Sequence, residues 1–167
     1  MRFAAPAAAL SLLVAVTSSV SLGAEREPRP EAALLIAKGD SALNAGDTQL
    51  AIDQYEAALV VDPSYALTFM HLAEAARQEG MQGKAIYYYR EVLNREPGNI
   101  PAIAGEGMAL AEKGAIEKAQ RNLANLRSMC GNNCSETSAL ADAIQRGPKP
   151  HMLAAETVLP DTSVTQN

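Results

Sequence analysis

The chain has 167 residues and a net charge of −5, and 48% of its residues are apolar while only 4% are aromatic. This length allows one modest domain, and the shortage of aromatic residues favours a core of small aliphatic side chains, as in closely packed helices. No cluster of Lys or Arg stands out in this acidic chain, which argues against nucleic acid and anionic membrane surfaces as partners.

Residues 1–24 have the layout of a secretory signal peptide. Arg2 supplies a positive charge, an apolar stretch is densest over residues 7–16, and small residues lead to Ala24. Because that stretch is shorter than the roughly 20 residues of a membrane span, we expect cleavage and no stable membrane anchor afterwards. The predicted location is exported, periplasmic or secreted; the alternative is a retained N-terminal anchor. Residues 25–31, rich in proline and charge, are predicted to be a flexible lead-in.

Three segments then align without gaps at a fixed spacing, namely 32–65, 66–99 and 100–133. Each segment contains two stretches in which apolar residues recur with the period of an α-helix. The predicted helices span about 32–45, 48–60, 66–79, 82–95, 100–113 and 116–129. The aligned columns include the glycines Gly46, Gly80 and Gly114, the alanines Ala51, Ala85 and Ala119, and the bulky residues Tyr55, Tyr89 and Leu123.

These columns have mechanical explanations. Each aligned glycine falls between two helices, where a left-handed residue ends the first helix at little cost. Small residues at aligned helix positions let two helices approach closely, and the Tyr and Leu column fills the space between hairpins. Pro63 and Pro97 end the second helix of their units. The alternative is a helical bundle with chance periodicity.

The columns resemble those of the tetratricopeptide repeat (TPR) family. The signature residues are Leu35, Gly39, Ala51, Tyr55, Ala58 and Pro63 in the first unit, and Phe69, Leu72, Ala73, Ala85, Tyr89 and Pro97 in the second. The third unit keeps Gly107 and Ala119 but has Leu126 at a late alanine position and lacks the proline. The resemblance implies an all-α fold, a right-handed α-solenoid of three TPR hairpins, over a domain of residues 32–146.

A seventh, capping helix is predicted at 136–146, with Ser135 as its N-cap and Gly147 ending it. Residues 147–167 lack a helical period and are predicted to be a disordered tail.

Cys130 and Cys134 lie between the last repeat and the cap, and an exported protein meets oxidising conditions, so we predict a disulfide. A thiol-active accessory protein that uses this pair is the alternative function. We predict no metal site, because the cysteines lack two further ligands and His151 lies in the tail.

No phosphate loop, nucleophile elbow or dinucleotide fingerprint occurs, so we predict a protein that is not an enzyme and binds no cofactor. His71, Glu74 and Arg77 share a helix face and are interpreted as a solvated polar patch rather than an acid–base group.

The resemblance further implies a groove lined by the first helix of each hairpin, which grips a segment of another protein. The groove residues carried over are Ile36, Asp40, Leu43, Leu67, Met70, His71, Glu74, Arg77, Met108 and Glu112. Family members that bind chaperone tails hold a carboxylate with Lys, Arg and Asn, but here those places carry Ile36, Asp40, Pro101 and Gly105. The hypothesis is therefore a non-catalytic scaffold of the cell envelope that binds an apolar or amphipathic protein segment, in assembly of a pilus or secretion machine. A solenoid that self-associates, as a homo-oligomer burying its own groove, is a further alternative.

Overall fold

The computed structural model describes residues 26–148, which form seven α-helices and no strand. The predicted signal peptide and the tail beyond Pro148 lie outside the described residues. Every helix begins and ends within two residues of its predicted bounds. The helices are α1 (Pro30–Asn44), α2 (Thr48–Val61), α3 (Ala66–Gln78), α4 (Gln82–Arg95), α5 (Ile100–Glu112), α6 (Ile116–Cys130) and α7 (Ser135–Arg146).

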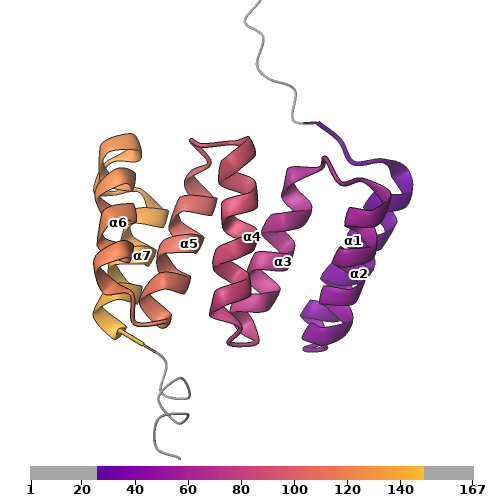
Figure 1. Ribbon diagram of the computed structural model, residues 1–167, viewed down its shortest axis with the longest axis horizontal. Helices are drawn as coiled ribbons and strands as arrows, with labels where there is room; N and C mark the ends of the chain where they lie inside the picture. The colour runs from indigo at the N-terminus through magenta and orange to yellow at the C-terminus, as the bar shows by residue number, and fades with distance from the viewer. Residues whose placement is uncertain (1–25, 149–167) are drawn as a thin grey trace, which may run out of the picture.

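The helices stack as successive antiparallel hairpins in chain order, so the predicted all-α solenoid is confirmed (Figure 1). Helices α1 and α2, α3 and α4, and α5 and α6 pair within hairpins, while α2 contacts α3 and α4 contacts α5. Helix α7 packs on both α5 and α6, as expected of a cap. Among residues 26–148, no helix has the length and apolarity needed to cross a membrane.

The aligned glycines end the first helix of each hairpin as predicted. Gly46, Gly80 and Gly114 have φ values of 83°, 75° and 87°, in the left-handed region that other residues rarely adopt. The Asp47 amide, one residue after Gly46, donates to the Ala42 carbonyl at 2.9 Å. The Asp47 carboxylate then caps α2 by accepting from the Leu50 amide at 3.1 Å.

The core consists of two clusters of small and aliphatic side chains that follow the hairpins. One joins α1 and α2 to Leu72 and Ala75 of α3, and the other runs from α3 to α7. Close packing within a hairpin depends on a missing side chain at Gly39, because a Cβ atom there would overlap the ring of Tyr55. The small-residue columns of the sequence therefore set how near the helices lie.

The start of the described chain differs from the prediction. Residues 26–29 are not a free lead-in: the Arg26 guanidinium contacts both Asp62 oxygens, at 3.1 and 3.2 Å, and the Arg29 amide donates to Asp62 Oδ2 at 3.1 Å. The Ser64 hydroxyl donates to Asp62 Oδ1 at 3.0 Å. Asp62 is buried, so its charge demands partners, and the lead-in supplies them at the α2–α3 turn. Composition alone did not reveal this anchor.

Replacing Asp62 by Asn is expected to lower the melting temperature at pH 7, with a deficit that shrinks in acid. Burial alone would raise the pKa of Asp62, but the Arg29 amide, Ser64 and Arg26 outweigh it and hold that pKa below its ordinary value. A lowered folded-state pKa stabilises the fold above the unfolded pKa of about 3.9 and loses that effect as pH falls through the folded value. Thermal unfolding from pH 7 to pH 2 measures this, with exposed Asp53→Asn as control; a pH-independent deficit would contradict the account.

Candidate binding groove

A pocket of about 500 Å³ opens where the first helices of the hairpins meet the start of α7. Its lining is mostly apolar, from two methionines and several small residues, with a few polar groups among them. Such a surface suits an apolar ligand whose orientation is fixed by a few polar contacts. The lining residues are Leu43, Met70, His71, Glu74, Tyr89, Pro101, Ala104, Gly105, Met108, Ser135, Glu136 and Ala139.

Half of the predicted groove residues line this pocket, namely Leu43, Met70, His71, Glu74 and Met108. The others do not line it. Ile36 belongs to the buried core around α1 and α2, and Leu67 is half-buried near the start of α3. Asp40 and Arg77 make polar contacts with the lining residues His71 and Glu74, and Glu112 pairs with Arg77. A role for these ten residues in contacting a partner remains a prediction.

Two tyrosines on second helices hold two acids of the groove helices. The Tyr55 hydroxyl donates to Asp40 Oδ1 at 2.8 Å, and the Tyr89 hydroxyl donates to Glu74 Oε2 at 3.1 Å. The second pair is the first one shifted by one repeat. The aligned tyrosines therefore do more than fill space, because each fixes a carboxylate of the groove through its polar end.

Arg77 joins two hairpins at the groove. Its guanidinium lies 2.7 Å from Glu74 Oε1 on its own helix and 2.8 Å from Glu112 Oε1 on α5. The Arg77 side chain is 20% exposed and that of Glu112 only 9%. The interpretation of Glu74 and Arg77 as a solvated patch is therefore wrong: a carboxylate of the next repeat, which the sequence cannot place, completes a half-buried network.

The electrostatics of the site keep Glu74 charged and the hydroxyls of Tyr55 and Tyr89 protonated. Burial alone would raise the pKa of Glu74, but the hydrogen bonds and positive charge of Arg77 outweigh it and hold that pKa below its ordinary value. Burial and the Glu74 carboxylate raise the pKa of Tyr89 well above its ordinary range. Burial and Asp40 do the same to the pKa of Tyr55. Both hydroxyls therefore stay protonated and serve as donors.

His71 faces the first hairpin rather than its helix neighbour Glu74. Its Nδ1 lies 3.1 Å from Asp40 Oδ1, and its ring centroid is 5.1 Å from that of Tyr55. The shared partner Asp40 thus links the groove faces of α1 and α3. His71, Asp40 and Tyr55 therefore form one polar cluster between the first and second hairpins.

The pocket floor needs a glycine. A Cβ atom at Gly105 would overlap the ring of Tyr89, which is 2% exposed and reaches between α3 and α5. Gly105 therefore lets the tyrosine ring approach the α5 backbone and place its hydroxyl on Glu74. Gly105 thus both packs against the Tyr89 ring and lines the open pocket.

Helix α7 supplies a wall of the pocket that was not predicted from the sequence. Ser135, Glu136 and Ala139 line it, all from the first turns of α7. The sequence predicts that α7 covers the last hairpin. It carries no signal that the N-terminal end of α7 also reaches the groove. The predicted N-cap role of Ser135 is wrong, since Cys134 takes that position without a side-chain cap.

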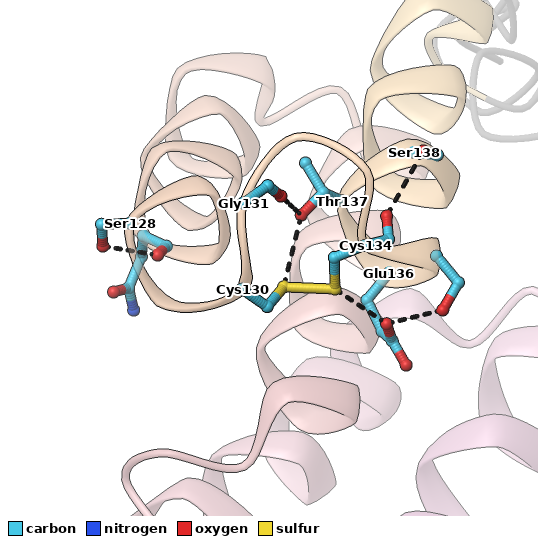
Figure 2. The surroundings of a disulfide bond; sticks show 9 residues. Ser128, Cys130, Gly131, Cys134, Glu136, Thr137 and Ser138 are labelled. Carbon is cyan, nitrogen blue, oxygen red and sulfur yellow. Dashed lines mark hydrogen bonds between the residues drawn. A yellow bond between two sulfur atoms is a disulfide. The ribbon is translucent and has the colours of Figure 1, made fainter.

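The start of α7 is fixed by the two cysteines. Cys130 and Cys134 form a disulfide that joins the end of α6 to the residue before α7 (Figure 2). In the same turn, the Thr137 hydroxyl donates to the Gly131 carbonyl at 3.0 Å. Covalent and hydrogen-bonded ties thus hold the α7 wall in place beside the groove.

Removing the disulfide is expected to destabilise the fold by about 2 kcal/mol on the chain-entropy estimate for so short a loop. Cys130→Ser/Cys134→Ser should also raise hydrogen exchange over the first turns of α7 while α1 and α2 keep their protection. Chemical denaturation and hydrogen exchange measure both effects. An unchanged stability, together with a thiol pair that readily exchanges with small disulfides, would favour the thiol-active alternative.

Stacked hairpins with small-residue contacts, a hollow along their first helices and a terminal cap define a solenoid of TPR type. Searches against family models and against curated proteins give no match. Solved structures do match. The chain resembles the first TPR of Spaghetti (RPAP3) bound to HSP90 peptide SRMEEVD, with a TM-score of 0.63, 20% identity and coverage of 74% of this chain and 98% of that one.

Two further structures support the same fold. The Sgt2 TPR domain from Aspergillus fumigatus has a TM-score of 0.63 and 21% identity, covering 84% of this chain and 91% of that one. The second TPR domain of human RPAP3, in complex with HSP70 peptide SGPTIEEVD, has a TM-score of 0.59 and 16% identity, covering 67% and 97%. The chain is an all-α TPR solenoid in fold; identities this low carry no more than the fold.

Proposed function

We propose that this protein is a non-catalytic interaction scaffold of the cell envelope whose groove binds an apolar or amphipathic segment of another protein. The observation that carries the proposal is the apolar pocket of about 500 Å³ that spans three hairpins and the cap. Met70 and Met108 give it adaptable walls, which suit apolar side chains of varied shape. The structural neighbours bound to peptides support a protein segment as the ligand.

The charges around the pocket favour a ligand with basic residues. Glu74 and Glu136 line the pocket, and Asp40 and Glu112 lie beside it. Among the predicted groove residues and the lining residues, Arg77 is the one arginine or lysine. The hydrogen bond from Ser135 and a backbone amide hold the pKa of Glu136 below its ordinary value, so it is charged at neutral pH. An apolar segment flanked by Lys or Arg fits this field best.

The same charges disfavour acidic tails. The peptides SRMEEVD and SGPTIEEVD bound by the neighbours each carry three acidic residues. Where family members that take chaperone tails have cationic or amide side chains, this chain has Ile36, Asp40, Pro101 and Gly105. An acidic tail would meet carboxylates without a basic clamp, and like charges at an interface are strongly unfavourable.

The proposal places the scaffold outside the cytoplasm, because residues 1–24 have the pattern of an export signal. A role in assembling a pilus or a secretion machine is the finer part of the proposal. It rests on the combination of export with a binding solenoid, and identification of the partner would test it.

Peptide titration tests the groove directly. Three amphipathic helical peptides share one Leu/Met face and carry Lys, Ser or Glu on its flanks, with SRMEEVD as a fourth ligand. The Lys peptide is expected to bind most tightly, the Glu peptide and SRMEEVD most weakly, with a preference that falls as salt rises. Fluorescence anisotropy or calorimetry gives the dissociation constants.

Variants assign the binding to the groove. Met108→Glu should weaken the binding of every peptide, and Glu136→Gln should reduce the preference for Lys over Glu by about twofold to fivefold, the value of one partly exposed charge pair. Glu117→Gln, on an exposed position of α6, is the matched control and should change nothing. Equal binding of all peptides, or binding that Met108→Glu leaves intact, would refute the groove.

A further inference from the structure

The first hairpin of the solenoid carries a second hollow, which is lined by residues of α1 and α2 alone. Its volume is about 630 Å³. Two of the large apolar side chains that are exposed within residues 26–148, Leu34 and Leu50, line it. We call this surface the N-terminal face; its residues are Leu34, Ala37, Lys38, Ser41, Ala42, Leu50 and Gln54.

The repeat shows that this face is built to be covered. Leu34 is 65% exposed, whereas its counterparts one and two repeats later, Thr68 and Ala102, are 0% exposed. The counterparts lie on α3 and α5, the helices through which the second and third hairpins contact the hairpin before them. Position 34 therefore sits on the stacking surface of a hairpin that has no predecessor within the described residues.

The neighbouring positions agree. Lys38 and Ser41 are exposed, while their counterparts Leu72 and Ala75 are 0% exposed and belong to the core cluster of α1 and α2. Position 38 carries a lysine where the next repeat has the fully buried Leu72, so this part of the first hairpin is suited to contact with solvent. The exposed Leu34 and Leu50 nevertheless make the N-terminal face apolar enough to favour burial against a partner.

The other end of the solenoid is closed in a different way. Helix α7 covers α5 and α6, and the positions it turns outward are polar and exposed, as at Ser138, Asp142 and Gln145. Within residues 26–148, helix α7 exposes no large apolar side chain that could receive the N-terminal face of another copy. Head-to-tail stacking into a longer solenoid is thereby disfavoured, which leaves a twofold pairing of N-terminal faces as the mode of self-association that keeps the groove free.

The exposed stripe of α1 is self-complementary in charge. Glu31, Leu34 and Lys38 follow one another at helical spacing, with an acid at one end, an apolar side chain in the middle and a base at the other. Two such helices, antiparallel about a twofold axis near Leu34, would place each Glu31 opposite the partner's Lys38 and bring the two Leu34 side chains together.

We propose that the N-terminal face is a homodimer interface, in which α1 of one copy pairs antiparallel with α1 of a second copy. Leu34 and Leu50 form its apolar centre and the two Glu31–Lys38 pairs set its register. No residue of the N-terminal face lines the groove, so a dimer would present two binding grooves at once. This differs from a solenoid that buries its own groove.

Charge reversal and restoration test the register. Sedimentation equilibrium on the purified full chain is expected to show a monomer–dimer equilibrium. Glu31→Lys alone and Lys38→Glu alone should each raise the dimer dissociation constant about tenfold, since each puts like charges together twice across the axis. The double reversal Glu31→Lys/Lys38→Glu should return it to within about threefold of the original. Lys84→Glu, exposed on α4, is the control and should leave it unchanged.

Leu34→Asp tests the apolar centre and should abolish dimerisation while circular dichroism and peptide binding in the groove stay unchanged. A chain that is monomeric at every concentration would overturn the proposal. A dimer that survives Leu34→Asp, or one that the double reversal fails to restore after both single reversals break it, would overturn it as well. None of these results bears on the groove, because the groove peptides are measured separately.

Discussion

Replacing Tyr89 by Ala is expected to destabilise the fold by about 3–5 kcal/mol, as for other large aromatic side chains deleted from a core. Tyr89 is almost completely buried, its ring lies against Gly105 of the next hairpin, and its hydroxyl holds Glu74. The truncation leaves a cavity between the second and third hairpins and takes a donor from a half-buried carboxylate. Urea unfolding followed by circular dichroism measures the loss.

Tyr89→Phe separates the two contributions. It keeps the ring against Gly105 and removes only the hydroxyl, so a loss of about 1 kcal/mol is expected. Tyr87→Ala, on an exposed position of the same helix, should cost little. A Tyr89→Ala variant as stable as Tyr87→Ala would mean that the hairpins do not stack through this ring, and would contradict the described core.

Arg77→Met has the second large expected effect, a loss of about 3 kcal/mol. Breaking a buried ion pair leaves an uncompensated charge, which costs about 3–5 kcal/mol when the pair is fully buried. Glu112 is nearly buried but Glu74 is 38% exposed, so the lower end of that range applies. The methionine keeps much of the side-chain volume, which confines the change to charge and hydrogen bonds. Chemical denaturation at pH 7 measures the loss.

Acid and a rescue variant test the cause of the Arg77→Met loss. Arg77 holds the pKa of Glu74 below its ordinary value, so the original chain loses this stabilisation as the pH falls through that lowered pKa, and the deficit of Arg77→Met should shrink in acid. Arg77→Met/Glu74→Gln/Glu112→Gln should recover part of the stability at pH 7, because no buried charge is left unpaired. A triple variant less stable than Arg77→Met would show that the two acids have other essential partners.

The helices and turns were predictable because local chemistry fixes them. Gly46 and its aligned counterparts need positive φ wherever they sit, and the period of the apolar residues sets each helix before any tertiary contact. The aligned small residues, Gly39 among them, predicted close approach between helices. At Gly39 the ring of Tyr55 lies where a Cβ atom would be.

The groove was harder to predict, because its composition depends on contacts between repeats. The pairing of Arg77 with Glu112 and of His71 with Asp40 joins residues about a repeat apart, whose side-chain directions no single-helix pattern specifies. The wall from α7 depends on how the cap docks, and the anchoring of Asp62 depends on a segment whose composition indicated flexibility. Each of these features depends on contacts between segments that lie far apart in the sequence.

Photo-crosslinking in the producing cells tests the central claim, that the groove is where a partner protein binds. A photoreactive residue replaces Met108 in the groove or, as the matched control, Val60, which is 83% exposed on α2 and lines none of the pockets described. We predict a discrete adduct with another protein from position 108 that the Lys-bearing peptide displaces, and none from position 60. Adducts from position 60 with none from position 108 would contradict it.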